Sequence, residues 1–165
     1  MGINMKTEII DDFLPQTDFD VISGVFASRQ LAWTCIDDDP SQNGIQFCDV
    51  LYTDFAPCSH LWPLLESIHP VLKPGAYSRV KANLQPRTEK IIQNNFHSDF
   101  ADCITSIFYL NSNNGYTLFE DGTKIDSVAN RLLTFDSNLN HTGTTCTDQL
   151  TRMVINFNYY KREQL

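Results

Sequence analysis

The sequence predicts an α+β protein: a jelly roll (double-stranded β-helix) with N-terminal helices packed on one outer face. Two observations lead to this fold class. Residues 17–30 and 59–72 carry apolar side chains at helical spacing. From residue 75 onward, runs of β-branched and aromatic residues alternate with turn signals, which is typical of successive antiparallel strands. Such a run after helices closes most easily as a barrel or jelly roll that the helices cover on one outer face.

The first 72 residues are expected to form a mixed, partly helical support for this barrel. In order, the expected elements are a short strand and turn at 7–14, a helix at 17–30, a strand at 31–36, a solvent-exposed turn at 37–44, a strand at 45–53 and a second helix at 59–72. Thr17 is the candidate N-cap of the first helix because Asp18 and Asp20 follow it in the first turn. Ser59 is the candidate cap of the second helix.

Residues 75–160 are expected to form the jelly-roll core. The expected strands cover 76–84, 104–111, 116–120, 131–135 and 152–160, with turns at Asn114-Gly115, Asp121-Gly122 and 138–140. The side chains assigned to the barrel core are Thr117, Phe119, Phe135, Ile155 and Phe157. A chain of 165 residues has room for one hydrophobic core but not comfortably for two, so residues 1–165 are expected to form a single domain.

The composition narrows the classes of partner. The net charge is −8, and an acidic surface repels phosphate groups, which argues against nucleic acids and anionic membranes as partners. No apolar run reaches the length of a membrane-spanning helix, and the acidic N-terminal segment is unlike a secretory signal. A cytoplasmic protein is therefore expected, in the host cytoplasm if the chain is viral. The five cysteines form no Cys-x-x-Cys pair and are expected to be reduced thiols, mostly small core side chains.

The stretch "NNFHSDF" at 94–100 places an imidazole and a carboxylate two residues apart, just before a predicted strand. Strand side chains alternate, so His97 and Asp99 are expected on the same side. The only histidine downstream is His141, which lies 44 residues after His97. Two histidines and one carboxylate leave one face of an octahedral ion open, which suits an Fe(II) that binds a co-substrate and oxygen together. The simpler interpretation is a loop histidine beside a solvated aspartate.

A fixed cation is expected on the last predicted strand. Because side chains alternate along a strand, Arg152 and every second residue after it are expected to face the barrel interior. These residues are Arg152, Val154, Asn156 and Asn158. The residues between them, Met153, Ile155, Phe157 and Tyr159, form an apolar face that fits packing against a helix. A buried guanidinium needs a partner, and a dicarboxylate co-substrate would supply one through a bidentate salt bridge.

The order His-x-Asp, a distant His and then an Arg about one strand later resembles the Fe(II)/2-oxoglutarate-dependent dioxygenases. More narrowly, the sequence is similar to the prolyl-4-hydroxylase-like branch, which includes short members from phage and bacterial genomes. The matching segments are "HSD" at 97–99, "ITSIFYLN" at 104–111, "NGYTLFEDG" at 114–122, "NRLLTFDSNLNHTG" at 130–143 and "RMVIN" at 152–156. The resemblance covers residues 75–160 well and the first 70 only in layout. Asn130 replaces a glycine found in many members, a mild departure because Asn tolerates a left-handed backbone.

The resemblance implies a role for each matched residue. It implies that His97, Asp99 and His141 bind Fe(II). Arg152 would pair with the distal carboxylate of 2-oxoglutarate, and the Tyr109 hydroxyl would contact the same carboxylate.

The strand before the His-x-Asp motif offers a further co-substrate contact, because many members carry a Tyr there. The candidates are Tyr77, Lys81 and Asn83, and Asn83 has the best spacing to His97. The implied activity is hydroxylation of an unactivated C–H bond with Fe(II), 2-oxoglutarate and O2, releasing succinate and CO2, with ascorbate as a candidate reductant. A peptidyl proline is one candidate substrate, and other peptides, proteins and small molecules stay open.

Two other functions compete with the hydroxylase. One is a non-catalytic jelly-roll module that serves binding or assembly, and the other is a cupin-like metalloenzyme that does not use 2-oxoglutarate. Basic residues cluster just before the motif in this acidic chain, at Arg79, Lys81, Arg87 and Lys90. If residues 85–95 form a lid, this charge would steer an acidic substrate to the site; a solvated loop is the alternative. The sequence does not indicate the oligomeric state.

Overall fold

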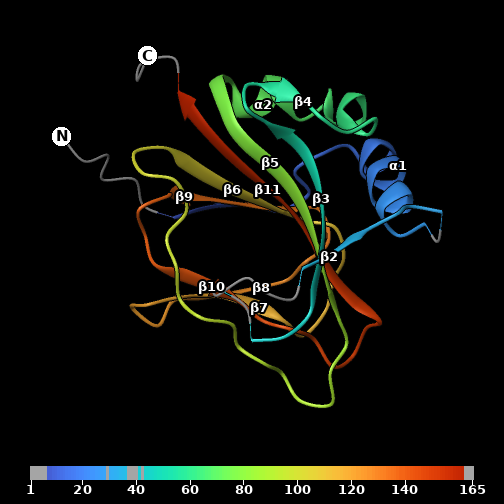
Figure 1. Cartoon of the computed structure of the whole chain (residues 1–165), viewed down its shortest axis with the longest axis vertical. Helices are drawn as coiled ribbons and strands as arrows, with labels where there is room; N and C mark the ends of the chain where they lie inside the picture. Colours follow the sequence, from blue (N-terminus) through green and yellow to red (C-terminus); the bar gives the residue numbers. More distant parts are fainter. Residues whose placement is uncertain (1–6, 29, 37–40, 42, 162–165) are drawn as a thin grey trace.

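The computed structural model describes residues 7–28, 30–36, 41 and 43–161, so most of the turn expected at 37–44 lies outside the described residues. The described chain is mostly β, with two antiparallel sheets and few helices (Figure 1). The larger sheet has the strand order β1-β9-β6-β11-β5-β3-β2, with β4 paired to β3, and the smaller sheet has the order β10-β7-β8. The described chain therefore contains less helix than the predicted α+β fold class implies.

The strands expected in both halves of the chain are present, and three short strands are added. The strands of the larger sheet are β1 (Glu8–Ile10), β2 (Thr34–Ile36), β3 (Gln46–Thr53), β4 (Ala56–Pro57), β5 (Pro74–Pro86), β6 (Ile104–Tyr109), β9 (Arg131–Asp136) and β11 (Thr151–Lys161). Those of the smaller sheet are β7 (Tyr116–Phe119), β8 (Lys124–Asp126) and β10 (His141–Gly143). The sequence analysis missed β4, β8 and β10, each of which has three residues or fewer.

The helices differ from the expectation in extent and capping. Helix α1 covers Gln16–Phe26 and begins after Pro15, so Thr17 lies in its first turn and is not its N-cap. The second expected helix is broken into a 3-10 turn, η1 (Trp62–Leu65), and a short helix, α2 (His69–Leu72). Pro63 and Pro70 explain the break, because proline lacks the N–H that a helix interior needs and is tolerated only in a first turn. Ser59 lies before η1 and does not cap it.

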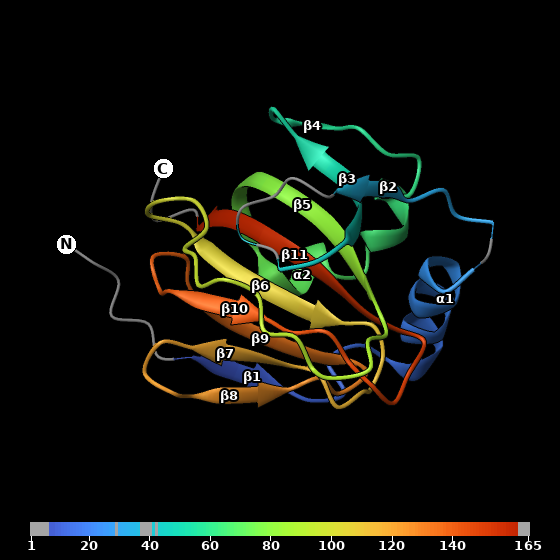
Figure 2. The same ribbon diagram turned by 60° about the horizontal axis from the view of Figure 1, so that its bottom comes forward.

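The larger sheet has two differently occupied faces. Figures 1 and 2 show the smaller sheet on one side of it and α1 and α2 on the other. The main apolar cluster joins the helices to the sheet and contains Phe19, Ile22 and Phe26 of α1 together with Ile155 and Phe157 of β11. A second cluster lies between the two sheets and contains Ile107, Tyr109, Phe119, Ile125, Leu133, Phe135 and Val154. Ile155 and Phe157 are thus buried core residues, and they lie in the helix-side cluster, on the face of β11 that was expected to pack against a helix.

The alternation predicted for β11 is confirmed. Met153, Ile155, Phe157 and Tyr159 belong to the helix-side cluster, whereas Arg152, Val154 and Asn156 line a pocket between the sheets.

Alternation fails at the start of β5. A register shift between Asn158 and Tyr159 of β11 pairs Asn158 with Arg79 but Tyr159 with Tyr77, which is one residue further than a regular ladder allows. This bulge turns Tyr77 to the helix side, where its hydroxyl lies 2.7 Å from the Nδ1 of His69. Tyr77 is thus excluded from the pocket that Lys81 and Asn83 line.

Two turn positions have the left-handed backbone that their residue types favour. Asn130 has a φ of 61° and Gly122 a φ of 88°. The Asn130 side chain also fixes the chain before α1, since its Oδ1 accepts the N–H of Leu14 at 3.0 Å and its Nδ2 donates to the Leu14 carbonyl at 2.8 Å. All five cysteines have free thiols; Cys48, Cys103 and Cys146 are buried, and Cys35 and Cys58 are exposed. None of the described helices combines the length and hydrophobicity needed to cross a bilayer.

Candidate metal centre

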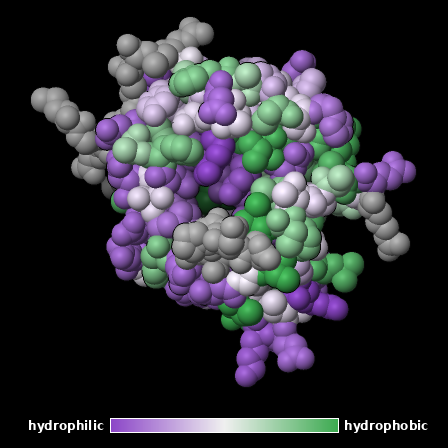
Figure 3. Space-filling view, in the orientation of Figure 1, coloured by the Kyte–Doolittle hydropathy of each residue, from purple (hydrophilic) through white to green (hydrophobic). Residues whose placement is uncertain are grey.

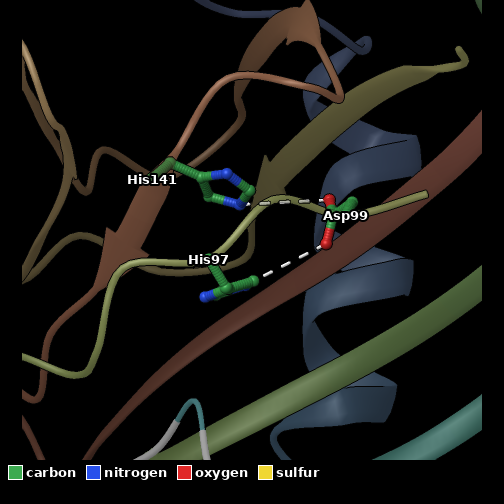
Figure 4. Close-up of side chains that lie close together, drawn as sticks. All are labelled: His97, Asp99 and His141. Atoms are coloured by element: carbon green, nitrogen blue, oxygen red, sulfur yellow. Dashed lines mark ion pairs between the residues drawn. The ribbon is translucent and has the colours of Figure 1, made fainter. Parts of the chain in front are cut away.

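The three side chains predicted to bind metal meet at one point in the described structure. One potential ligand atom from each of His97, Asp99 and His141 lies within 4.8 Å of the other two. The Nε2 of His97 is 4.0 Å from Asp99 Oδ1, and the Nε2 of His141 is 3.9 Å from Asp99 Oδ2 (Figure 4). His141 comes from β10 of the smaller sheet, while His97 and Asp99 come from the segment that leads into β6.

A short backbone pairing holds the two imidazoles in place. The His97 N–H donates to the His141 carbonyl at 3.0 Å, and the His141 N–H donates to the His97 carbonyl at 2.9 Å. The Nδ1 of His97 contacts the Asn95 carbonyl at 3.2 Å, and the Nδ1 of His141 contacts the Leu139 carbonyl at 3.0 Å. A carbonyl can only accept, so each Nδ1 carries a proton, and each Nε2, which faces the shared point, is the nitrogen available to a metal. Burial lowers the pKa of His141, which favours the neutral imidazole that a metal requires.

Asp99 is held as a carboxylate. Its Oδ2 accepts hydrogen bonds from Thr105 Oγ1 at 2.7 Å and Asn158 Nδ2 at 3.0 Å, and the Arg79 Nη2 lies 3.8 Å from its Oδ1. Burial alone would raise the pKa of Asp99. The neighbouring His141 imidazole, the two hydrogen bonds and the charge of Arg79 together outweigh it, so the pKa lies below its ordinary value. Two free imidazole nitrogens and an ionised carboxylate are a donor set that fits a divalent ion such as Fe(II).

A pocket between the two sheets extends from this point (Figure 3 shows a hollow bordered largely by hydrophilic residues). Side chains from β3, β5, β6, β7, β10 and β11 line it. The lining includes the three candidate ligands and is completed by Ser41, Gln46, Arg79, Lys81, Asn83, Gln85, Asn94, Ile107, Thr117, Gly143, Arg152, Val154 and Asn156. Thr117 is therefore a pocket residue and not only a core residue.

Arg152 lies in this pocket without an acidic partner. Its side chain is buried, with 5% of the residue exposed, and no carboxylate of the described chain lies within 4.0 Å of it. Its Nε donates to Ser127 Oγ at 2.9 Å and its Nη2 donates to Thr117 Oγ1 at 3.2 Å. Burial lowers the pKa of Arg152, but a guanidinium remains charged in proteins. Two neutral hydroxyls do not balance this charge, so the guanidinium is suited to an anionic ligand.

Glycines make room for this guanidinium. A Cβ added at Gly115 would lie 2.8 Å from Arg152 Cδ, and one added at Gly143 would lie 3.3 Å from Arg152 Nη1. The Arg152 side chain therefore passes over two backbone positions that lack side chains, and its outer edge reaches the β10 backbone two residues beyond His141.

The other two predicted co-substrate contacts lie in different places. The Tyr109 hydroxyl is 2.7 Å from Thr117 Oγ1, but Tyr109 is fully buried and does not line the pocket; burial raises its pKa. Asn83 does line the pocket, where its Oδ1 accepts a hydrogen bond from Gln46 Nε2 at 3.2 Å. Sequence reasoning gave no role to Thr117 as the link between Tyr109 and Arg152.

Asn158 and Thr105 were also missed as partners of Asp99. Asn158 could have been found, because the alternation of β11 places it on the same face as Arg152. Thr105 could not, because its contact with Asp99 depends on how the loop before β6 turns.

The segment 85–95 lies against the chain after β10. The N–H of Thr88 donates to the Cys146 carbonyl at 3.1 Å, and the N–H of Asn94 donates to the Gly143 carbonyl at 3.1 Å. Gln85 and Asn94 line the pocket from this segment, whereas Arg87 and Lys90 are exposed and do not. The basic residues at the pocket are instead Arg79 and Lys81 of β5, together with Arg152.

No family model and no curated protein matches the sequence. Solved structures match it along most of its length. A prolyl hydroxylase of Trichoplax adhaerens, in complex with a hypoxia inducible factor oxygen degradation domain peptide fragment, has a TM-score of 0.66 and 16% identity over 96% of this chain and 84% of its own. A prolyl-4-hydroxylase of Pseudomonas putida has a TM-score of 0.64 and 15% identity over 96% and 94%. A 2OG-Fe(II) oxygenase family oxidoreductase of Burkholderia pseudomallei has a TM-score of 0.65 and 13% identity over 93% and 84%.

The chain has the fold of the 2-oxoglutarate–Fe(II) oxygenases. The fold that the motifs implied is thus confirmed. The structural similarity also includes the first 70 residues, which the motifs did not cover. Within this oxygenase fold, the His-x-Asp…His set converges and a buried arginine lies in the adjoining pocket.

Proposed function

We propose that the protein is an Fe(II)- and 2-oxoglutarate-dependent dioxygenase that hydroxylates an unactivated C–H bond and releases succinate and CO2. One observation carries the proposal. A convergent set of two imidazoles and a carboxylate shares a pocket with a buried guanidinium that has no acidic partner among the described residues. A dicarboxylate 2-oxo acid fits both features, since one end can reach the metal while the other pairs with the arginine.

The pocket residues have different roles in the proposed function. His97, Asp99 and His141 would hold the iron, and Arg152 would bind the distal carboxylate of 2-oxoglutarate. Thr117 fixes the guanidinium by a 3.2 Å hydrogen bond and is itself held by Tyr109. Bound iron, with O2 and the 2-oxo acid, supplies the oxidising chemistry. The chain positions the reactants and excludes water from the space between the sheets.

A peptidyl proline is the first substrate to test, because two of the matched structures are described as prolyl hydroxylases. Fold does not determine substrate, so the screen extends to other peptides and to small molecules. A gain of one oxygen atom, detected by mass spectrometry, identifies the substrate in either case.

The test of the oxygenase proposal is an anaerobic titration with Fe(II) and 2-oxoglutarate, followed by visible absorption. The wild-type protein should develop the charge-transfer band of a 2-oxo acid bound to Fe(II). Arg152→Ala removes a charge-assisted bidentate contact, so its affinity for 2-oxoglutarate should fall roughly tenfold to a hundredfold. Its Fe(II) affinity should be unchanged, because Arg152 is not one of the candidate ligands. Arg87→Ala is the matched control, as Arg87 is exposed and outside the pocket.

The same experiment separates the competing functions. Metal binding without a charge-transfer band or succinate formation would indicate a cupin-like or other site that does not use 2-oxoglutarate. Failure to bind either ligand would leave a non-catalytic jelly-roll module.

A further inference from the structure

The pocket has a positive lining in an acidic chain. Among its described lining residues, Arg79, Lys81 and Arg152 are cationic and Asp99 is the one acid, whereas the whole chain has a net charge of −8. In the proposed function, Asp99 binds the metal and Arg152 binds 2-oxoglutarate. The proposed function assigns no role to Arg79 or Lys81.

Arg79 and Arg152 lie at opposite ends of the pocket. In the pairing of β5 with β11, Arg152 is opposite Gln85 and Arg79 is opposite Asn158. The six residue steps from Arg79 to Gln85 along β5 span about 20 Å. The Arg79 Nη2 is 3.8 Å from Asp99 Oδ1, which places this guanidinium beside the metal centre and at the far end from Arg152. The strand pairing therefore separates the two arginines along the pocket.

The contacts of Arg79 leave much of its donor capacity unused. Its Nη2 donates to Asn158 Oδ1 at 3.3 Å, and its guanidinium carbon lies 4.8 Å from the centre of the Phe100 ring. Its Nε is buried and has no hydrogen-bond partner in the described structure. A guanidinium carries five N–H donors, and the nearby Asp99 carboxylate is committed to the metal in the holoenzyme.

A hydrogen-bond acceptor lies between the two ends of the pocket. Asn156 lines the pocket from β11, opposite Lys81 on β5, and its Oδ1 is buried without a partner among the described residues. An unused acceptor of this kind suits an N–H donor of a ligand. The Arg79 cation lies at the candidate metal centre, and the unused acceptor of Asn156 lies opposite Lys81, two residues further along β5. Together they are complementary to a molecule in which an amide or amine N–H lies near a carboxylate.

We infer that Arg79, assisted by Lys81, binds a carboxylate of the primary substrate, while Asn156 Oδ1 accepts an N–H of the same molecule. The substrate class is therefore an amino-acid derivative with a free carboxylate, or a peptide in which an acidic residue lies beside the oxidised position. The planar guanidinium matches a planar carboxylate in a two-point contact. This inference rests on the proposed function, because it assigns Asp99 and Arg152 to the metal and to 2-oxoglutarate.

The experiment uses the protein loaded with Mn(II) and saturated with 2-oxoglutarate, without O2. Mn(II) broadens the proton NMR signals of any molecule that binds close to it, so mixtures can be screened before a substrate is known. One arm uses N-acetyl amino acids and, as neutral counterparts, their amides. A second arm uses capped dipeptides that contain Asp or Glu and the matching Asn or Gln dipeptides. Protein loaded with diamagnetic Zn(II) gives the reference spectra.

Members of at least one carboxylate pool should be broadened selectively, and their amide counterparts should not. The arm that responds identifies the source of the carboxylate as a free small acid or an acidic peptide. Arg79→Gln should weaken this binding about tenfold or more and Lys81→Gln by a smaller factor, while Arg79→Lys should restore part of it. Arg87→Gln, an exposed control outside the pocket, should behave like the wild type.

The experiment distinguishes failure of this inference from failure of the proposed function. Loading is measured first, by Mn(II) electron paramagnetic resonance and by calorimetry with 2-oxoglutarate, for every variant. If loading fails in the wild type, the proposed function is wrong and the inference falls with it. If loading succeeds but no carboxylate probe is broadened, or amides and carboxylates respond equally, the inference is wrong. It is also overturned if Arg79→Gln loses only metal affinity, since Arg79 would then merely position Asp99.

Discussion

A single hydroxyl, that of Thr117, connects the buried Tyr109 to Arg152 in the pocket. Thr117 Oγ1 lies 2.7 Å from the Tyr109 hydroxyl and accepts the N–H of Arg152 Nη2 at 3.2 Å. Both neighbours are buried, so the hydroxyl is their shared hydrogen-bond partner in a place with little access to water. In such a position a lost partner is costly, because the remaining groups keep their desolvation penalty.

Thr117→Val removes this hydroxyl and nearly preserves the side-chain volume. The free energy of unfolding should fall by about 1–3 kcal/mol, because the Tyr109 hydroxyl and one Arg152 N–H lose their partner. The dissociation constant for 2-oxoglutarate should rise roughly tenfold, because Arg152 is less well fixed. Urea unfolding and calorimetry measure the two effects. Thr117→Ser, which keeps the hydroxyl, is the control; if Val and Ser behave alike, the link has no role in binding.

Sequence reasoning found the residues whose chemistry is visible in the residue type. His97, Asp99 and His141 combine rare ligand types with a recognisable order, and Arg152 is a charge on the inner face of an apolar strand. Thr117 carries no such signal, because threonine is common in strands for conformational reasons alone. Its role depends on Tyr109 of β6 and Arg152 of β11, which belong to the other sheet, so the contact is a property of the fold and not of the local sequence.

At the scale of elements, the short strand β10 combines two tasks. It supplies His141 at one end and Gly143 at the other, and its pairing with β7 places Gly143 opposite Thr117. Glycine at this point leaves the space that the Arg152 guanidinium approaches. The strand thus fixes the distance between His141 and the space that the Arg152 guanidinium occupies.

Gly143→Ala should shift the Arg152 guanidinium relative to His141 and change little else. The new Cβ would lie 3.3 Å from Arg152 Nη1, so the guanidinium must move by a few tenths of an ångström. We expect 2-oxoglutarate binding to weaken by about fivefold, on the order of 1 kcal/mol, with unchanged affinity for Mn(II). Calorimetry with each ligand measures both quantities. A variant that lost Mn(II) affinity to the same degree would show that the change had distorted β10 as a whole.

Gly115→Ala offers a contrast on the neighbouring loop. Its Cβ would lie 2.8 Å from both Arg152 Cδ and the Thr145 carbonyl oxygen, and a backbone atom cannot move aside as a side-chain end can. The free energy of unfolding should therefore fall by about 1–3 kcal/mol, as measured by urea unfolding. A fully stable Gly115→Ala protein would contradict the close approach at this position.

The elements that the sequence predicted well are those with long, regular patterns. The periodicity of α1 and the apolar runs of β5, β6, β9 and β11 were sufficient. The second helix was predicted as one piece because its apolar spacing outweighed Pro63 and Pro70, which in fact divide it. Strand β10 has too few residues for any periodicity. The bulge in β5 leaves no signal in the sequence, so Tyr77 was one of the candidates for a co-substrate contact although it lies on the helix side.

At the scale of the whole molecule, the two faces of the larger sheet differ: the helix side is apolar, whereas the other side carries both a smaller apolar cluster and the polar pocket. Its helix side carries the main apolar cluster, and its other side carries the pocket with the charged and amide side chains. Successive residues of β11 point to opposite sides of the sheet, so this strand contributes side chains to both the helix-side cluster and the pocket. Neighbouring positions in the chain should therefore respond to truncation in different ways.

Val154 and Ile155 provide the comparison. Ile155 is fully buried in the helix-side cluster, so Ile155→Ala should lower the free energy of unfolding by about 2–5 kcal/mol, because it leaves a cavity that neighbours fill only in part. The protein that remains folded should bind 2-oxoglutarate normally. Val154 lines the pocket between Arg152 and Asn156, so Val154→Ala should change the dissociation constant for 2-oxoglutarate at a smaller cost in stability. Thermal unfolding and calorimetry on both variants measure the two quantities. If Ile155→Ala weakens 2-oxoglutarate binding as much as Val154→Ala does, the two faces of the sheet are coupled and the separation is wrong.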